Sequence, residues 1–464
     1  MAQRWKVLLI TSVGLFMASL DLFIVNIAFP DLAKDFSGTS LPSLSWVLNA
    51  YAIVFAALLV PAGRIADRVG RKRIFVSGLL TFAAASALCA LAPSIPFLVA
   101  ARVLQAAGGA LMIPTTLGLI LPAFPIEQRT LAIGIWSAVG GVAAALGPPI
   151  GGLLVQLSWR WIFVVNVPIG ILTAIVALRV LDEVREPEDG RPDLLGAAEL
   201  ALGIGILTLG IVKGPEWGWG DTRTLAAFAG AVLLVAAFIH RSAHHHAPVI
   251  ELPLLRVRSF ALANLAALVF FAGFGSMLLS GVLLLTEVWG YSALKAGFAL
   301  SPGPLMAATF AIPSGRLGGR IGQRPIATAG GLTFAAGFAY ILATVGSTPE
   351  YETTFLPGFM LGGAGVGMTL GTLPAAAAAG LPPSRFATGT AVFSMARQLG
   401  AAIGVAVLVA LLNDSTGGDL LAGLQRGWWF SLLAGFGTAA LALAIGPIAA
   451  PAARPAQAEL ATSP

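Results

Sequence analysis

The chain has 464 residues, of which 57% are hydrophobic and only 10% are charged, and its formal net charge is +6. Soluble domains carry about 25% charged residues, so this composition excludes an ordinary soluble protein and favours one that lies in a lipid bilayer. The single cysteine, Cys89, excludes a disulfide framework and a cysteine-based metal site.

Apolar runs, each long enough for one helical crossing, recur from one end of the chain to the other. The first run follows Arg4 and Lys6, as in a signal peptide, but it is long and lacks a small-residue cleavage site, so we expect it to be the first span. The pattern predicts about fourteen transmembrane helices. Their cores are expected near residues 7–29, 44–63, 74–92, 97–121, 131–155, 161–180, 194–212, 223–240, 260–286, 294–313, 326–345, 354–379, 389–412 and 428–449.

The distribution of basic residues predicts the orientation of these spans. When fourteen spans are threaded through a bilayer, most of the 27 lysines and arginines fall in connections on one side, and cytoplasmic loops are the ones that retain positive charge. We therefore predict a multi-pass protein of the plasma membrane, monomeric, with both termini in the cytoplasm. The basic balance reflects this topology, and no nucleic-acid partner is expected.

An internal repeat predicts the domain organisation. The stretches at residues 63–73 (GRIADRVGRKR) and 315–324 (GRLGGRIGQR) resemble each other and lie about 252 residues apart, which indicates a duplicated half. We predict an all-α integral membrane fold of two six-helix bundles plus two inserted helices. The expected domains are an N-terminal bundle over 1–181, a linker with the inserted helices over 182–258, a C-terminal bundle over 259–449 and a disordered cytoplasmic tail over 450–464.

Two charged residues lie inside predicted spans of the first half. An ionised side chain such as that of Asp21 costs about 3 kcal/mol in the middle of a membrane helix, and low dielectric favours its neutral, protonated form. Asp21 is therefore the expected proton-exchanging group, unless it is permanently hydrogen-bonded to Asn26 or to a neighbouring helix. Arg102, with Gln105 one turn later, either pairs with an acid and takes part in proton coupling or braces backbone carbonyl groups.

The second half contributes two further candidates. Arg397 lies inside the thirteenth predicted span, where it either lines a substrate cavity or anchors the helix. Glu287 follows the ninth span and is either an extracellular gate or an interfacial acid. With Asn26 and Gln105, these residues are the candidate cavity and substrate contacts.

Glycine-containing motifs indicate where helices turn or approach closely. In the loop at residues 63–73, Gly63 permits a close helix contact and Gly70 permits a tight turn without a Cβ penalty. Asp67 and Arg71 can then interact across the loop as a conformational latch, although a basic loop that only sets orientation is the simpler alternative. In the fifth span, the sequence GPPIGG provides Gly147, Pro148, Gly151 and Gly152, which permit close helix packing and a kink.

These motifs together resemble a known family. The loop between the second and third spans resembles the signature of the major facilitator superfamily, and GPxxGG on the fifth span resembles the antiporter motif of its proton-driven drug exporters. The pattern L-D-x-x-x-V-N-x-x-x-P at residues 20–30, the sequences WRWIF and NVPIG before and within the sixth span, and the pair Arg102 and Gln105 are also similar to that group. With about fourteen spans, the chain resembles the fourteen-span drug:proton antiporter branch.

The resemblance implies a proton-coupled efflux transporter that exports lipophilic or cationic small molecules by alternating access. The proton gradient would be the energy source, and no cofactor and no metal site are implied. Some departures from the family pattern occur: Ala106 and Ala143 replace glycines, and Gly319 replaces the acid in the second copy of the loop, so the latch should be asymmetric. No acid lies deep in spans ten to fourteen, which argues against broad transport of dicationic drugs.

Other functions compete with multidrug export. A dedicated exporter of one endogenous metabolite or antibiotic would have the same features. A membrane receptor or scaffold needs neither an intramembrane acid nor a latch loop. An enzyme is not expected, because no paired carboxylates, nucleophile with base, phosphate-binding loop or metal-ligand spacing occurs. The triplet at residues 244–246 (HHH) can bind metal, but on one short connection it is expected to be a polar connector.

Overall fold

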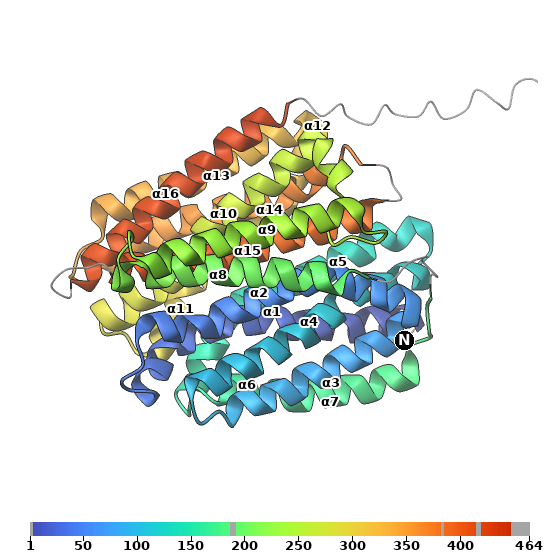
Figure 1. The fold of residues 1–464 in the computed structure, drawn as a ribbon, viewed down its shortest axis with the longest axis horizontal. Helices are drawn as coiled ribbons and strands as arrows, with labels where there is room; N and C mark the ends of the chain where they lie inside the picture. Colours follow the sequence, from blue (N-terminus) through green and yellow to red (C-terminus); the bar gives the residue numbers. More distant parts are fainter. Residues whose placement is uncertain (1–2, 186–191, 382–384, 414–418, 447–464) are drawn as a thin grey trace, which may run out of the picture.

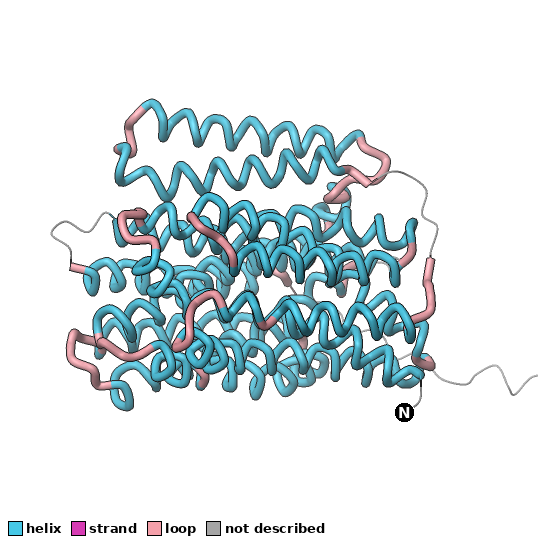
Figure 2. Tube along the Cα trace, turned by 90° about the horizontal axis from the view of Figure 1, so that it is seen from below, coloured by secondary structure: helices cyan, strands magenta, loops and turns pink. Residues whose placement is uncertain are grey.

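The computed structural model describes residues 3–185, 192–381, 385–413 and 419–446. Its long helices run along one common axis (Figures 1 and 2). The first part contains α1 (Gln3–Asp35), α2 (Leu41–Val69), α3 (Arg71–Ala90), α4 (Ile95–Ala123), α5 (Ile126–Val155), α6 (Trp161–Val164), α7 (Asn166–Val180), α8 (Leu194–Trp217) and α9 (Thr222–His244). The second part contains η1 (Leu252–Arg256), α10 (Arg258–Leu283), η2 (Leu284–Val288), α11 (Ala293–Leu300), α12 (Pro302–Ile321), α13 (Gln323–Thr344), η3 (Tyr351–Phe355), α14 (Leu356–Ala378), α15 (Phe386–Asn413) and α16 (Leu420–Ala444).

The predicted all-helical membrane architecture is confirmed, although the sixth crossing is divided into α6 and α7 at Val165 and the tenth is also interrupted. Among the described residues, 13 helical segments are long and apolar enough to span a membrane. The predicted span at 294–313 is divided between α11 and α12, which meet at Ser301. Pro302 lies at the start of α12, where its missing N–H is tolerated, and Arg316 and Arg320 make this helix less apolar than its neighbours. The tenth predicted crossing is therefore a broken helix.

Helix packing follows the internal repeat. In the N-terminal bundle (α1–α7), α3 packs against α4, α1 against α5, and α2 against α4. In the C-terminal bundle (α10–α16), the equivalent pairs are α13 with α14, α10 with α15, and α12 with α14. The two halves of the chain thus build the same arrangement of helices, as transporters with internal repeats do.

The repeat extends to single close contacts. A Cβ atom at Gly108 of α4 would lie 2.6 Å from the backbone nitrogen of Phe82 in α3, and a Cβ at Gly365 of α14 would lie 2.6 Å from the backbone nitrogen of Phe334 in α13. In lipid, helices associate mainly through packing of this kind, because there is no hydrophobic force to drive them together. Glycine at both positions allows the third and fourth helices of each bundle to touch.

The ends of the bundle differ in charge. We call the end where α1 begins, and where the α2–α3 and α12–α13 connections lie, the basic end; it is at the right of Figure 1, with α11 near the opposite end at the left. The inserted helices α8 and α9 pack against each other, and α8 also contacts α2 and α15. The two bundles meet mainly where α2 contacts α15 and α5 contacts α11, and also where α5 contacts α12 and α1 contacts α10 and α11. The predicted tail at 450–464 lies outside the described residues.

Candidate functional site

Asp21 and Arg102 form an ion pair inside the N-terminal bundle. Oδ2 of Asp21, in α1, lies 2.5 Å from Nη1 of Arg102, in α4. Each residue is only 1% exposed. A buried charge is tolerated when it is paired and hydrogen-bonded, so these two residues compensate each other at a depth where either one alone would be strongly unfavourable.

Gln105 completes the polar network around this pair. Its Oε1 accepts a hydrogen bond from Arg102 Nη1 at 2.6 Å, and its Nε2 donates to Asp21 Oδ1 at 2.9 Å. The same nitrogen donates to Oγ of Ser86, in α3, at 2.9 Å, and Sγ of Cys89 lies 3.7 Å from Gln105 Oε1. Both carboxylate oxygens of Asp21 therefore have partners, and three helices meet at one buried charge pair.

Arg102 also supports a neighbouring helix. Its Nε donates to the carbonyl oxygen of Val47 in α2 at 3.0 Å, and its guanidinium carbon lies 4.1 Å from the centre of the Tyr51 ring. Arg102 thus pairs with an acid and also braces a carbonyl group, while its part in proton coupling stays a prediction. Asn26 is not a partner of Asp21, because its Nδ2 donates to the carbonyl oxygen of Leu22. No sequence pattern indicated that Ser86 or Tyr51 belongs to this site.

The segment at residues 63–73 is not a loop as predicted: it consists of the last turns of α2, Gly70 and the start of α3. Contacts within the N-terminal bundle hold it in place. Nε of Arg71 lies 2.7 Å from Oδ1 of Asp67, and Nη1 of Arg71 donates to the carbonyl oxygen of Gly118 in α4 at 2.9 Å. Gly63, in α2, lies near Pro114 of α4, and a Cβ atom at Gly63 would be at ordinary contact distance from it. The predicted contact between Asp67 and Arg71 is present, and it ties the ends of α2 and α3 to α4.

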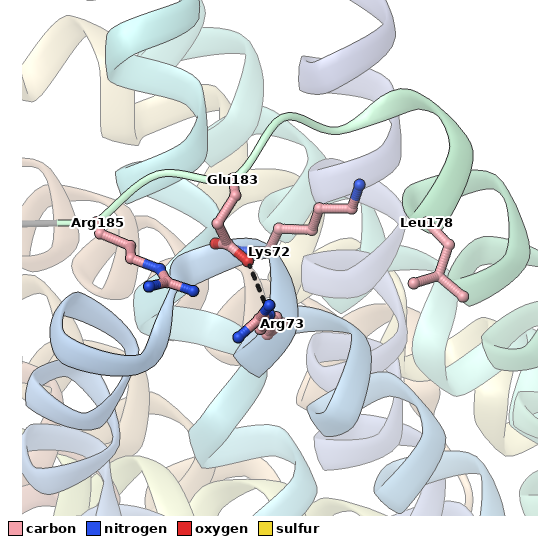
Figure 3. Close-up of a pocket in the computed structure, with 5 residues that line it drawn as sticks. All are labelled: Lys72, Arg73, Leu178, Glu183 and Arg185. Atoms are coloured by element: carbon pink, nitrogen blue, oxygen red, sulfur yellow. Dashed lines mark hydrogen bonds and ion pairs between the residues drawn. The ribbon is translucent and has the colours of Figure 1, made fainter.

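Gly70 is required by both its backbone angle and its surroundings. Its φ of +127° lies in a region that favours glycine, and a Cβ there would lie 2.5 Å from the Glu183 carboxyl group. Glu183 accepts a hydrogen bond from the backbone N–H of Lys72 at 2.9 Å and lies 3.7 Å from Nε of Arg73. Figure 3 shows this acid from the segment after α7 turned toward Arg73, beside a cavity of about 640 Å³. Sequence analysis had assigned Glu183 only to a solvated linker.

A second acid missed by sequence analysis connects the two bundles at the basic end. Oε1 of Glu251, just before η1, lies 2.5 Å from Nη1 of Arg385, which precedes α15. The same oxygen lies 3.5 Å from Nη2 of Arg64, in α2. One carboxylate in the connection after the inserted helices thus contacts an arginine from each bundle.

We expect Glu251→Gln to favour separation of the bundles at the basic end. Partly exposed ion pairs contribute up to about 1 kcal/mol, so the population open at this end should rise by up to about fivefold. The distance distribution between spin labels at Val69 and Arg320 measures this change. Glu216→Gln, which removes the Lys213 ion pair of α8 at the opposite end, is the control. An unchanged distribution in Glu251→Gln would show that this contact does not hold the bundles together.

The GPPIGG sequence gives α5 two different contact faces. On one face, a Cβ at Gly147 would lie 2.6 Å from Cβ of Phe23, and one at Gly151 would lie 2.9 Å from Ile24, so this face packs against α1. On the other, a Cβ at Gly152 would lie 2.6 Å from the carbonyl oxygen of Ala293 in α11. The motif therefore joins α1 of its own bundle to α11 of the other.

Pro148 also lies on the face of α5 that contacts α11, and its carbonyl oxygen lies very close to Gly297 of α11. A Cβ at Gly297 in α11 would overlap the carbonyl oxygen of Pro148. The α5–α11 contact, near the opposite end, thus brings backbone against backbone between the two bundles.

The remaining candidates lie apart from the Asp21 network. Arg397 lies in α15 with its guanidinium carbon 4.8 Å from the centre of the Phe271 ring in α10. Glu287 is exposed and lies in η2, the short segment that follows α10 at the opposite end. The structure therefore brings together Asp21, Arg102 and Gln105, and it places Arg397 and Glu287 elsewhere.

The histidine triplet shows ordinary local contacts. Nδ1 of His244 is 2.8 Å from the carbonyl oxygen of His240, and Nδ1 of His245 accepts from the backbone N–H of Ala247 at 3.1 Å. Within the described part of the chain, no three or more histidine, cysteine, aspartate and glutamate residues are grouped as a metal site would need.

Comparison with known proteins identifies similar membrane transporters. The family described as Major Facilitator Superfamily matches residues 11–405 and 265–463. The chain is 35% identical to a probable actinorhodin transporter of Streptomyces coelicolor, over 92% of this chain and 75% of that protein. It is 34% identical to the multidrug resistance protein Stp of Mycobacterium tuberculosis, over 90% of this chain and 78% of that protein. Among solved structures, a bacterial homologue of the lysosomal transporter Spinster aligns with a TM-score of 0.66 at 18% identity, over 96% of each chain.

Proposed function

The chain belongs to the major facilitator superfamily, and from this membership we propose that it exports small amphiphilic molecules in exchange for protons by alternating access. Relatives named as antibiotic and multidrug exporters or resistance proteins support an efflux function. The concentration of basic residues at the basic end supports a cytoplasmic position for that end, in the plasma membrane. In this arrangement a monomer carries the whole transport path between its two bundles.

The buried Asp21–Arg102 pair is the single observation that carries the proton-coupling part of the proposal. Protonation of Asp21 removes its charge and weakens its contact with Arg102. Arg102 then keeps Gln105 Oε1 and the Val47 carbonyl oxygen as hydrogen-bond acceptors and Tyr51 as an aromatic contact. Proton uptake therefore loosens α1 from α4 without leaving the arginine completely unpartnered.

The neighbours of Asp21 provide a physical route from this event to the second bundle. Phe23 and Ile24 lie two and three positions after Asp21 in α1. They pack closely against Gly147 and Gly151 of α5. The other face of α5 contacts α11. A shift of α1 on protonation would thus move α5 and change the contact between the bundles at the opposite end.

The basic end supplies a matching restraint. Asp67, Arg71 and Gly70 keep α2, α3 and α4 together as one unit. Arg64, near the end of α2, contacts Glu251, which also contacts Arg385 of the other bundle. We propose that the loop acts as the latch of one access state through this three-residue bridge. The second copy of the loop has Gly319 in place of the acid, so the latch is asymmetric.

Export of a single endogenous compound is the second candidate function. It is favoured by the name of the actinorhodin transporter and by the lack of a deep acid in spans ten to fourteen that would pair with cationic drugs. A panel of antibiotics and dyes, tested on a deletion strain and its complemented parent, separates the two. A multidrug exporter protects against several chemical classes, whereas a dedicated exporter protects against one.

Substrate-dependent proton movement tests the proposed function directly. Purified protein is reconstituted into liposomes that contain a pH-sensitive dye, and a library of aromatic antibiotics and dyes is added under an imposed pH gradient. We expect at least one compound to dissipate the gradient in protein-containing liposomes only. If every compound moves across the membrane at the same rate with and without a gradient, proton-coupled export is the wrong assignment.

A further inference from the structure

Arg397 is a partly buried cation without a counter-charge in the described part of the chain. It lies near the middle of α15, and the structure gives it no hydrogen bond or ion pair with a described residue, only the ring of Phe271 at 4.8 Å. Arg102, the buried cation of the N-terminal bundle, has an acid, an amide and a carbonyl oxygen as partners. A charge at this depth is costly without such partners, and a cation–π contact with one ring compensates for only part of that cost.

The helices around α15 do not supply the missing negative charge. α15 packs against α2, α8, α10, α14 and α16. Glu199 of α8, an acid on one of these helices, forms no ion pair with Arg397, although its Oε2 is buried without a partner. Next to Arg397, Nε2 of Gln398 is also buried without a hydrogen-bond partner, in a residue that is 9% exposed. Two adjacent donors of α15 thus lack acceptors.

Aromatic rings extend from Arg397 to the N-terminal bundle. The centre of the Phe271 ring is 5.5 Å from that of Phe274, which is 6.4 Å from that of Phe23 in α1. Phe274, Phe23 and Arg397 each keep part of their surface accessible, although α15 is surrounded by other helices. This aromatic row therefore connects the unpaired cation with the residue two positions after Asp21.

We propose that Arg397 and Phe271 form the subsite that receives the anionic group of an aromatic transported molecule, such as a carboxylate attached to a fused ring system. The inference rests on the proposed export function and names its substrate class. A guanidinium group binds a carboxylate through two parallel hydrogen bonds, and the rings of Phe271, Phe274 and Phe23 offer faces for the aromatic part. The substrate itself supplies the charge that Arg397 lacks, so aromatic anions are preferred over cations.

A series of probes that differ only in charge tests this preference. The probes are 2-naphthoate, methyl 2-naphthoate and 2-naphthylmethylammonium, and their binding to the purified full-length protein is measured at equilibrium. In the wild-type protein, 2-naphthoate should bind most tightly. Arg397→Gln should weaken 2-naphthoate binding at least about tenfold without weakening the ester. Arg397→Lys, which retains the charge but not the planar fork, should weaken it less.

Arg179→Gln, the same change at an exposed position of α7, is the control and should bind all three probes as the wild type does. Tighter binding of the ammonium probe, no binding of 2-naphthoate, or equal 2-naphthoate binding in wild type and Arg397→Gln each overturn the inference. The charge series in the wild type gives this answer even if Arg397→Gln does not fold. If the ester or the ammonium probe still drives proton exchange in liposomes, the proposed export function stands while the anionic subsite is rejected.

Discussion

Asp21→Asn is expected to reduce proton-driven export to the level of protein-free liposomes while the protein is still inserted in the membrane. Asparagine cannot exchange a proton, and it removes the charge that compensates Arg102 at 2.5 Å. Loss of one partner of a buried ion pair typically costs about 3–5 kcal/mol, so the midpoint of thermal unfolding should also fall. Transport is measured in liposomes under a pH gradient, and unfolding is followed in detergent.

A double variant separates the loss of the proton-exchanging group from the loss of stability. In Asp21→Asn/Arg102→Gln both charges are absent, and replacing both partners of a buried pair is often nearly neutral for stability. We expect the double variant to unfold at a higher temperature than Asp21→Asn and still to lack proton-driven export. Asp31→Asn, on the same helix but outside the network, should behave as the wild type. Unimpaired antiport in Asp21→Asn would remove Asp21 from the coupling mechanism.

Gly297→Ala is expected to shift the protein toward a state that is open at the opposite end. The added methyl group would overlap the Pro148 carbonyl oxygen in α5, and Gly152→Ala would meet the Ala293 carbonyl oxygen from the other side of the same contact. Overpacking costs about 1–3 kcal/mol, and here the bundles can relieve it by separating. The population open at this end should therefore rise by about fivefold to a hundredfold.

Spin labels at Leu157 and Ser347, both at the opposite end, report this change as longer distances. Cys89 is 0% exposed and should not react with the label. Gly141→Ala is the control on α5, because nothing lies within 4 Å of a Cβ at that position. If Gly297→Ala lowers thermal stability but leaves the distances unchanged, the α5–α11 contact is structural and does not separate during transport.

Much of the fold could be predicted because each crossing needs a long apolar run. The 252-residue repeat also identified equivalent positions correctly: Gly70 and Gly322 both have positive φ, at +127° and +96°, between consecutive helices. The broken crossing of α11 and α12 was predicted as one continuous span. Residues 294–313 are apolar on average, and hydropathy does not record that the chain changes helix at Ser301 and Pro302.

The buried charges of the candidate site could be predicted from the sequence, whereas the acids in its connections could not. Asp21 and Arg102 could be recognised because charged residues are rare and costly in apolar helices. Glu183 and Glu251 lie in polar connections, where acids are common, so no pattern distinguished them from solvated residues. Their partners come from segments more than 100 residues away.

The sequence by itself determined that this chain crosses a membrane many times, that its halves are related, and which few charges lie within the bilayer. Only the tertiary structure decided how those charges are used: Asp21 is compensated by Arg102 within one bundle, whereas Arg397 has an aromatic ring beside it and no acid among the described residues. The difference arises because hydrophobicity is a property of a segment and can be read along the chain. Charge compensation depends on which helices pack together, and packing brings side chains within a few ångströms regardless of their distance in sequence.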